Sequence, residues 1–481
     1  MFKRLIRFFQ GSSDIDMCNG PVMGKLLLFA VPLMLSGMLQ LLFNAADVVV
    51  VGQFCGSLSL AAVGSNGALV NLLVNLFIGI SVGTNVLVAK NFARQHADSV
   101  FRAVHSAILL SVIIGIFVGT FGAIYAPQLL HLVSVPDDVL PLAATYLRIY
   151  FLGMPATVVY NFGAAILRAV GDTKHPLYYL TTAGVVNVVT NLILVCIFHM
   201  DVAGVAIASA LSQYVAAFLT LRCLTKKETS CRLSFKMLRF YKKETLEMIR
   251  IGVPAGLQST IFSFSNVLIQ SSVNTFGSTV IAGHSAAGNI DQMIYIAMNS
   301  ISNTAVSFIS QNLGAGKMDR LPKIVRNCYI LVLSVGCGLC ATCFLLGRPL
   351  LSIFTPEKDV IEAGMIRLTW VTLPYFLCGV MDVGSGLVRG MGRSWLSMAV
   401  STFGACVLRI AWVYTIFAWN PTLQVLYLSY PCTWSLTAAV HGISVAILLR
   451  QIRRHKAAAA VHQMPPLEIT HRNHFTFPKG Y

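Results

Sequence analysis

Hydrophobic residues occur along this chain in long stretches, and short polar segments separate one stretch from the next. Each stretch has about 20 residues or more, which as a helix is long enough to cross the hydrocarbon core of a bilayer. Stretches of more than about 25 residues imply tilt, a kink or extension beyond the lipid. The pattern predicts twelve membrane-spanning helices, at residues 25–51, 60–89, 103–125, 141–169, 177–198, 203–222, 250–273, 280–312, 328–347, 361–388, 395–418 and 425–450.

The first half of the chain returns as the second half about 221 residues later. Residues that recur in the same order are Pro32 and Pro254, Asn44 and Asn266, Gly56 and Gly277, Asn91 and Asn312, and Gly171 and Gly392. Duplicated hydrophobic chains are typical of secondary transporters, whose substrate site lies between the repeats. Six helices per half is an even number, so both halves have the same orientation. We therefore expect an all-α integral membrane protein of two parallel six-helix repeats, related by a pseudo-twofold axis along the membrane normal.

Composition and charge agree with this prediction and give it an orientation. Hydrophobic residues make up 56% of the 481 residues and charged residues only 11%, against roughly a quarter charged in soluble proteins. Thirty of the 35 lysines and arginines lie in segments on the same side of the predicted membrane as the N-terminus. The positive-inside rule therefore predicts that both termini are cytoplasmic. These charges are spread over separate loops rather than one basic face, so we do not expect nucleic-acid binding.

The predicted spans divide the chain into five parts. These are a cytoplasmic N-terminal segment (1–24), an N-lobe (25–222), a basic cytoplasmic linker (223–249), a C-lobe (250–450) and a cytoplasmic tail (451–481). Aromatic residues alternate with basic ones near the N-terminus and in the linker, which predicts a short amphipathic helix on the membrane surface in each. The tail contains Pro465, Pro466 and four consecutive alanines, and we expect it to have little structure.

Three aspartates fall inside the predicted spans, where an ionised side chain is costly and usually serves a function. Asp47 ends a polar stripe on the first helix that includes Gln40 and Asn44 at helical spacing. Asp382 lies within the tenth helix. We interpret Asp47 and Asp382 as functional residues, whereas for Asp291, in the eighth helix, a functional role and a structural role stay open.

Amide side chains occupy equivalent elements of both halves, which predicts a water-filled path between the lobes. A single asparagine in a membrane helix is more often a contact between helices than a ligand. The further candidates are Asn71, Asn187, Asn191, Asn266, Gln270 and Gln292. For Arg409, in the eleventh helix, a structural ion pair is favoured over anion binding.

Four stretches resemble the multidrug and toxic compound extrusion (MATE) transporters. They are VPLMLSGMLQLLFNAADVVVVGQFCGSLSLAAVG at 31–64, GVPAGLQSTIFSFSNVLIQSSVNTFGSTVIAGH at 252–284, LRAVGDTKHP at 167–176 and VMDVGSGLVRGMGRS at 380–394. The resemblance extends over about residues 20 to 450. It implies a bacterial inner-membrane protein that exports organic, mostly cationic compounds in exchange for protons or sodium, by a rocker-switch between two lobes.

The resemblance also assigns coupling residues. In the family an acid fifteen residues after the proline of the first helix couples transport to the ion, and here that acid is Asp47. The acid of the tenth helix matches Asp382, which makes this residue the candidate for binding Na⁺. The chain departs from the family pattern at Phe262 and Cys378, where some members have an acid and a tyrosine, and at Asn191, where others have an acid. The choice between H⁺ and Na⁺ therefore stays open.

Two other classes of function can be weighed against drug export. A flippase for a lipid-linked precursor, from the same superfamily, is expected to need several arginines in its central cavity, and Arg409 is the main candidate here. The chain has no zinc His-Glu pattern, no Ser-His-Asp set and no P-loop, so we expect no enzymatic activity and no cofactor. The expected partners are small organic cations and the lipid bilayer, and a monomer is sufficient.

Overall fold

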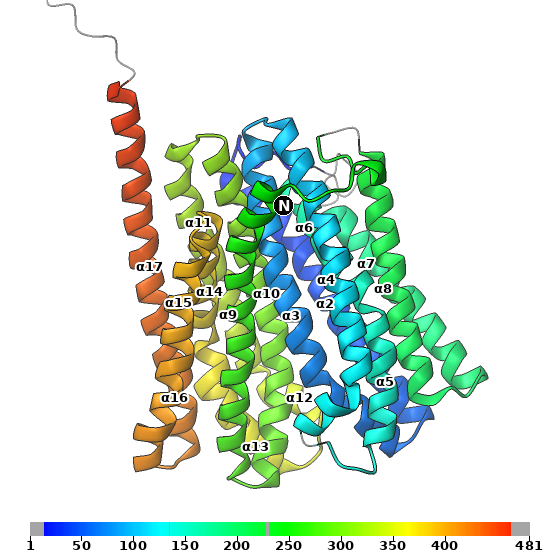
Figure 1. Cartoon of the computed structure of the whole chain (residues 1–481). Coiled ribbons are helices and arrows are strands. Elements are labelled where there is room, and N and C mark those ends of the chain that lie inside the picture. The colour runs from blue at the N-terminus through cyan, green and yellow to red at the C-terminus, as the bar shows by residue number, and fades with distance from the viewer. Residues whose placement is uncertain (1–13, 134, 228–229, 463–481) are drawn as a thin grey trace, which may run out of the picture.

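The computed structural model describes residues 14–133, 135–227 and 230–462, and nearly all of these residues are helical (Figure 1). The first half, here called the N lobe, ends where α8 ends. Its elements are α2 (Val22–Phe54), α3 (Ser57–Ala93), α4 (Ala97–Leu132), α5 (Leu140–Leu152), α6 (Met154–Ala169), α7 (Lys174–Leu192), the π-helical η1 (Ile193–Ile197) and α8 (Asp201–Lys226).

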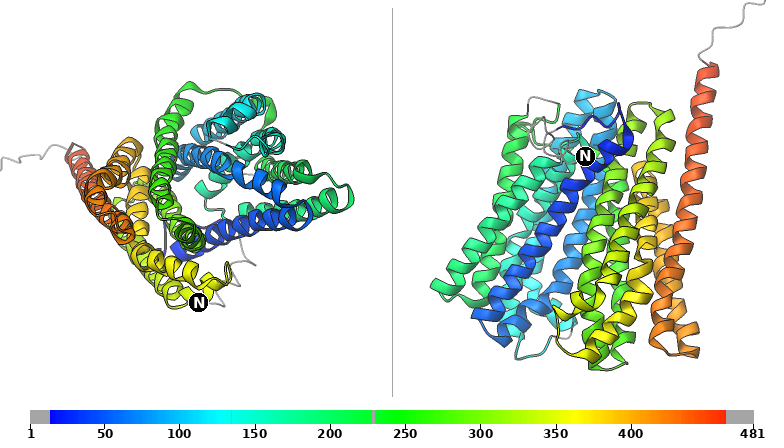
Figure 2. Two further views of the ribbon diagram at one scale, coloured as in Figure 1. Left: turned by 90° about the horizontal axis from the view of Figure 1, so that it is seen from below. Right: turned by 180° about the vertical axis from the view of Figure 1, so that it is seen from behind.

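The second half, here called the C lobe, begins with α9. After the short η2 (Phe235–Met237) in the linker, its elements are α9 (Lys242–Asn274), α10 (Ser278–Gly314), η3 (Met318–Arg320), α11 (Leu321–Leu345), α12 (Gly347–Ser352), α13 (Lys358–Arg367), η4 (Leu368–Thr372), η5 (Leu373–Tyr375), α14 (Phe376–Gly390), α15 (Ser394–Ser401), η6 (Thr402–Val407), α16 (Leu408–Trp412), η7 (Val413–Phe417) and α17 (Leu423–His462). Seen along the bundle, the helices of the two halves form two groups (Figure 2, left).

Within the described residues, nine helical segments are long and apolar enough to cross a membrane, and the bent pair α5–α6, with a 45° angle, makes a tenth. α9 has 33 residues and α10 has 37, so both are long enough to cross, although they carry more polar residues. The architecture is consistent with the twelve spans predicted from sequence. Large apolar side chains also point outward, among them Phe117, which is 69% exposed, and such a surface requires lipid around it.

The internal duplication is visible in the backbone. α2 and α9 both have 33 residues, and α3 and α10 both have 37. The residues before α3 and α10 are Gly56 and Gly277, with φ of 87° and 92°. Gly171 and Gly392 form a second matching pair, with φ of 99° and 79°. Residues other than glycine rarely adopt these positive φ angles, so the recurring glycines mark turns that both repeats share.

The lobes touch most extensively where α3 crosses α9. Gly79 packs against the backbone of Gly256, and Gly83 packs against Gly252 and the carbonyl of Met248, so that a side chain at either position would collide with a main chain. Small residues allow helices in membranes to approach closely in this way. The crossing lies near the C-terminal end of α3 and the N-terminal part of α9. We call this end, at the top of Figure 1, the linker end, because residues 227–241 join α8 to α9 there.

The linker differs from the amphipathic surface helix predicted from sequence. Among the described residues between α8 and α9, one helical turn occurs, the three-residue η2, and the others are extended or irregular. The backbone amides of Ser234 and Tyr241 donate to His105 and Ser106 of α4, each over 3.0 Å. Cys231 and Leu233 are buried in the N-lobe core. Since α4 satisfies these amides and accommodates the two apolar side chains, the segment follows α4 instead of forming a helix.

The tail prediction was wrong over its first part, because α17 continues to His462 and includes Ala457–Ala460. Alanine has the highest helix propensity, so an existing helix extends readily through four of them. The predicted amphipathic helix near the N-terminus and the prolines Pro465 and Pro466 lie outside the described residues.

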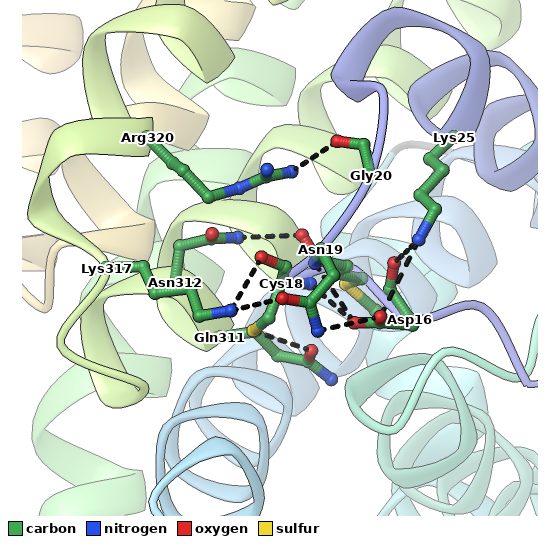
Figure 3. A network of polar contacts seen from close by, with 10 residues as sticks. Asp16, Cys18, Asn19, Gly20, Lys25, Gln311, Asn312, Lys317 and Arg320 are labelled. Atoms are coloured by element: carbon green, nitrogen blue, oxygen red, sulfur yellow. Dashed lines mark hydrogen bonds and ion pairs between the residues drawn. The ribbon is translucent and has the colours of Figure 1, made fainter.

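Residues 14–21 cross the linker end and touch both lobes. The amide of Ile15 donates to the carbonyl of Gly171 in the N lobe, whereas Ile15 and Met17 are buried in a cluster of mainly C-lobe residues, such as Leu321, with the start of α2. Asn312 and Arg320 donate to the carbonyls of Met17 and Gly20 over 3.0 Å each. Further contacts join Lys317 to Cys18 and Asn19, and Lys25 to Asp16 (Figure 3). The segment therefore ties the lobes together where they are already closest.

Candidate functional site

Two polar cavities lie in the lobes, on the far side of the α3–α9 crossing from the linker end. The N-lobe cavity has a volume of about 570 Å³ and the C-lobe cavity about 370 Å³. Each also borders one residue of the other half: Asn289 of α10 lines the N-lobe cavity, and Asn75 of α3 lines the C-lobe cavity. The cavities therefore face one another across the boundary between the lobes.

Most residues predicted from sequence line these cavities. Gln40, Asn44, Asp47, Asn71 and Asn187 line the N-lobe cavity, and Asn266, Gln270, Asp291, Gln292 and Asp382 line the C-lobe cavity. Asn191 lines neither of these two cavities but is fully buried against Asp47. The spacing of polar residues on single helices thus selected side chains that the fold brings together from α2, α3, α7, α9, α10 and α14.

Asp47 is held entirely by neutral groups. Its side chain, in a residue that is 8% exposed, accepts a hydrogen bond from the Asn191 amide over 2.8 Å and one from the Ser209 hydroxyl over 3.2 Å. Asn187 in turn donates to Ser209 over 3.4 Å. No lysine or arginine is among the described residues that line this cavity. An ionised Asp47 is therefore the dominant charge of the N-lobe cavity.

Asp291 forms a buried ion pair in the C lobe. Arg367 donates to its Oδ2 through Nε over 3.0 Å and through Nη2 over 2.8 Å, and Thr372 donates to Oδ1 over 2.5 Å. Arg367 also contacts His284, whose ring nitrogen lies 2.9 Å from the Tyr427 hydroxyl. The two charges compensate each other, so of the two roles left open for Asp291 the geometry favours the structural one.

Asp382 lines the same cavity and is 6% exposed. Asn299 donates to its carboxylate over 3.5 Å, and Ser302 donates to its main-chain carbonyl over 2.7 Å. The guanidinium of Arg389 reaches the same serine hydroxyl, at 3.5 Å, so a positive charge already lies close to this aspartate. Carboxylate, amide and hydroxyl oxygens suit Na⁺ in kind, but the nearby guanidinium opposes a second cation here.

Arg409 does not form the structural ion pair that was favoured from sequence. No described carboxylate lies within ion-pair distance of it, although the side chain is only 3% exposed. Its partners are Asn266 and Thr433, each over 3.4 Å, and the ring of Tyr430, whose centroid is 4.2 Å from the guanidinium carbon. Asp291, which lines the same cavity, is paired with Arg367 instead.

Sequence reasoning missed several residues of the site. Ser209 is a single hydroxyl among small residues of α8, and nothing in its local pattern distinguishes it. Arg367 did carry a signal, because an arginine in an apolar stretch is as costly as an aspartate there. Tyr430 and Trp434 have the composition of ordinary membrane-helix residues, and only the fold places them beside Arg409.

Comparison with known proteins identifies the family. The sequence profile of the MatE family matches residues 32–193 and again residues 254–415, which together are more than half of the chain. The chain belongs to the MATE family of multidrug efflux transporters. The two matches confirm that the halves are repeats of one unit. MATE proteins are transporters, in agreement with the prediction that the chain is not an enzyme.

Individual MATE relatives support this assignment. The "Probable multidrug resistance protein YpnP" of Bacillus subtilis is 28% identical over 405 residues, which are 84% of this chain and 90% of that protein. The "FAD transporter" of Shewanella oneidensis is 24% identical over 285 residues, 58% of this chain and 63% of that protein. A solved structure has the same fold, with a TM-score of 0.85. It is described as "Outward-facing conformation of a multidrug resistance MATE family transporter of the MOP superfamily". The two chains are 19% identical, and the match covers 92% of this chain and 99% of that chain.

Proposed function

We propose that this protein exports small organic compounds, mostly cations, across the bacterial inner membrane in exchange for a cation, and that Asp47 is the coupling residue. The observation that carries the proposal is the environment of Asp47, a buried carboxylate on a polar cavity wall that no basic residue lines. An organic cation in this cavity is attracted to the ionised carboxylate. Protonation of Asp47 removes that attraction, so the cavity binds either the proton or the organic cation.

The two asparagines beside Asp47 suit both protonation states. In the ionised state Asp47 accepts hydrogen bonds, as from the amide of Asn191. A protonated carboxyl has a hydrogen to donate. The side-chain oxygens of Asn187 and Asn191 are buried and accept no hydrogen bond within the described residues. Rotation of either amide presents such an oxygen to the carboxyl, so proton binding leaves no donor unsatisfied.

The arrangement of the lobes supports a rocker-switch with the linker end in the cytoplasm. Lysines and arginines are concentrated at this end, as the positive-inside rule requires of a cytoplasmic side. The lobes touch there, and the cavities lie on the far side of that contact, so this conformation corresponds to the outward-facing state. Opening the α3–α9 contact and closing the opposite end alternates access to the same cavities. A monomer contains both lobes and is sufficient for this cycle.

Proteoliposomes test the proposal directly. Efflux of ethidium is measured under an imposed proton gradient or an imposed sodium gradient, for the wild type, Asp47→Asn and Asp382→Asn. We expect Asp47→Asn to lose at least about tenfold in gradient-driven rate, equivalent to 1.4 kcal/mol. Asp201→Asn is the matched control, since Asp201 belongs to the same lobe but accepts a hydrogen bond from Ser59 away from the cavity. It should keep the wild-type rate.

Other outcomes would revise the proposal. Loss in Asp382→Asn alone, with sodium as the driving ion, would move coupling to the C lobe. If the wild type moved no organic cation under either gradient, drug export would be wrong and the lipid-precursor flippase would take its place. The cavities favour export over the flippase. Two arginines line the C-lobe cavity, and one of them, Arg367, is neutralised by Asp291, so the cavity lacks the several free arginines that a flippase is expected to need.

A further inference from the structure

Arg409 is a buried cation that has no counter-ion among the described residues. It belongs to α16, a five-residue helix between the π-helical stretches η6 and η7. Such π-helical segments occur frequently at functional sites. Burying a guanidinium costs several kcal/mol unless a carboxylate or several good hydrogen bonds compensate it. Here two hydrogen bonds of 3.4 Å and the face of an aromatic ring are available.

The hydrogen-bonding capacity of Arg409 is mostly unused. A guanidinium has five N–H donors. One nitrogen bonds Asn266, another bonds Thr433, and the buried Nε has no partner within the described residues. Arg367 provides the comparison within the same cavity wall, because its Nε and Nη2 both donate to Asp291 over 3.0 Å or less. Two buried arginines thus line one cavity, and only one of them has its anion.

The surroundings of Arg409 suit an aromatic ligand that carries an anionic group. Its guanidinium carbon lies 4.2 Å from the centroid of Tyr430 and 5.8 Å from that of Trp434, and the two rings pack edge to face. All three residues line the C-lobe cavity together with Asn266. Stacking on an aromatic face leaves the edge of a guanidinium free for the paired hydrogen bonds that a carboxylate accepts.

We propose that Arg409, with Asn266 and Tyr430, forms a subsite for the carboxylate of an aromatic substrate. The inference rests on the proposed function, since it places part of the exported compound in the C-lobe cavity. Asp47 then lines one of the two facing cavities and Arg409 the other, so that groups of opposite charge are available to one bound compound. The preferred substrates are therefore zwitterions or anions with an aromatic body, in addition to simple cations.

Binding of two matched dyes tests the subsite. Rhodamine B carries a cationic ring system and a free carboxylate, and its ethyl ester lacks the carboxylate. Fluorescence anisotropy with the full chain in lipid nanodiscs gives the dissociation constant of each dye.

We expect Arg409→Gln to weaken rhodamine B binding at least about tenfold and ester binding less than about threefold. Arg409→Lys keeps the positive charge without the planar guanidinium, and it should restore part of the preference for rhodamine B over its ester. Arg148→Gln is the control, because Arg148 is exposed on α5 and does not line the C-lobe cavity, and it should change neither constant.

Competition on the wild type gives a reading that does not depend on folding of a variant. 2-Naphthoate should displace rhodamine B at least about tenfold better than 2-naphthamide, which has the same aromatic body without the charge. Equal displacement by the two compounds, or an Arg409→Gln variant that weakens both dyes equally, would overturn the subsite. Displacement by vesicles of phosphatidic acid but not by naphthoate would assign Arg409 to a lipid headgroup and also overturn it.

Transport measurements separate this inference from the proposed function. If rhodamine B binds with the expected dependence on Arg409 but no dye moves under a proton or sodium gradient, the subsite stands and coupled export is wrong. If ethidium is exported and the acid-to-ester preference is absent, export stands and the subsite is wrong.

Discussion

Buried charges in this protein differ in what surrounds them, and the proposed ligand sites rest on that difference. Asp291 and Arg367 satisfy one another, whereas Asp47 faces amides and a hydroxyl and Arg409 faces an amide, a hydroxyl and an aromatic ring. A charge that already has a partner contributes to holding helices together. A charge without one leaves a net field in the cavity, available to a substrate or a coupling ion.

The Asp291–Arg367 pair should be required for stability. Replacing Arg367 by Met leaves a buried carboxylate without its cation, which typically costs about 3–5 kcal/mol. The double variant Asp291→Asn, Arg367→Met removes both charges and should recover most of that loss. Thermal unfolding in detergent measures the effect, with Arg348→Gln as control because the Arg348–Glu362 pair is exposed. Similar losses in the single and double variants would show that the pair is not the cause.

Asp172 should make stability at the linker end dependent on pH. It lies in the turn between α6 and α7, where burial acts to raise its pKa, but the hydrogen bond from His175 and the charge of Lys227 outweigh burial and hold the pKa below its usual value. A lowered pKa means that the folded state gains stability above the ordinary carboxyl pKa, about 4. That gain is lost as the pH falls through the lowered pKa.

The measurement is the melting temperature of the wild type and of Asp172→Asn at pH 7 and at pH 3. The variant should melt several degrees lower at pH 7, and the difference should shrink at pH 3, because the stabilisation is lost as the pH falls below the ordinary carboxyl pKa and through the lowered pKa of the folded state. A difference that is the same at both pH values would contradict this assignment.

At the scale of elements, close approach between helices depends on residues without side chains. α3 and α9 cross where Gly83 meets Gly252, and an added Cβ at Gly83 would come within 2.8 Å of the Gly252 nitrogen. π-helical stretches mark other places where a helix departs from regular geometry, as η4 does at Thr372, which donates to Asp291. The glycines let two helices approach closely, and the π-helical stretch places a side chain that hydrogen-bonds a buried carboxylate.

Alanine substitutions at two glycines should have opposite effects. Gly338 in α11 has open space around it, so Gly338→Ala should raise stability by about 0.5–1 kcal/mol through helix propensity. Gly83→Ala brings the same propensity gain but forces the backbones of α3 and α9 apart, and should lower the melting temperature. Thermal unfolding of the two variants compares them directly. Stabilisation by both substitutions would show that the crossing tolerates a wider separation.

At the scale of the whole molecule, residues 14–21 couple the two lobes. Met17 is completely buried against the C lobe, while the neighbouring Ile15 bonds the backbone of the N lobe at Gly171. The lobes cannot separate at the linker end without breaking one of these attachments. The segment therefore stabilises the conformation in which this end is closed.

Deletion of residues 1–20 should shift the protein towards the state open at the linker end. We expect amide hydrogen exchange to become about tenfold faster at residues 79–86 of α3 and 248–256 of α9, which form the lobe contact. Exchange at the opposite ends of the same helices should not accelerate. Asn312→Leu, which removes the hydrogen bond to the Met17 carbonyl, should give a smaller change in the same places. Uniform acceleration along both helices would indicate general destabilisation instead.

The sequence by itself determined the features that depend on local pattern. Hydrophobic length predicted the spans, the recurrence of Pro32 at Pro254 predicted the two repeats, and helical spacing placed Asn44 and Asp47 on one face. These predictions succeed because a helix in lipid must satisfy its own backbone and bury or cover its polar face, whatever the rest of the chain does.

Only the tertiary structure decided which distant charges meet. Asp291 and Arg367 lie 76 positions apart, and Asn191 and Asp47 lie 144 apart, so no local spacing relates them. The absence of an acid beside Arg409 among the described residues, and the burial of Met17 in a cluster of α2 and C-lobe residues, likewise follow from how the lobes pack. Ion pairing and burial depend on distances in space, which a linear pattern of residues does not contain.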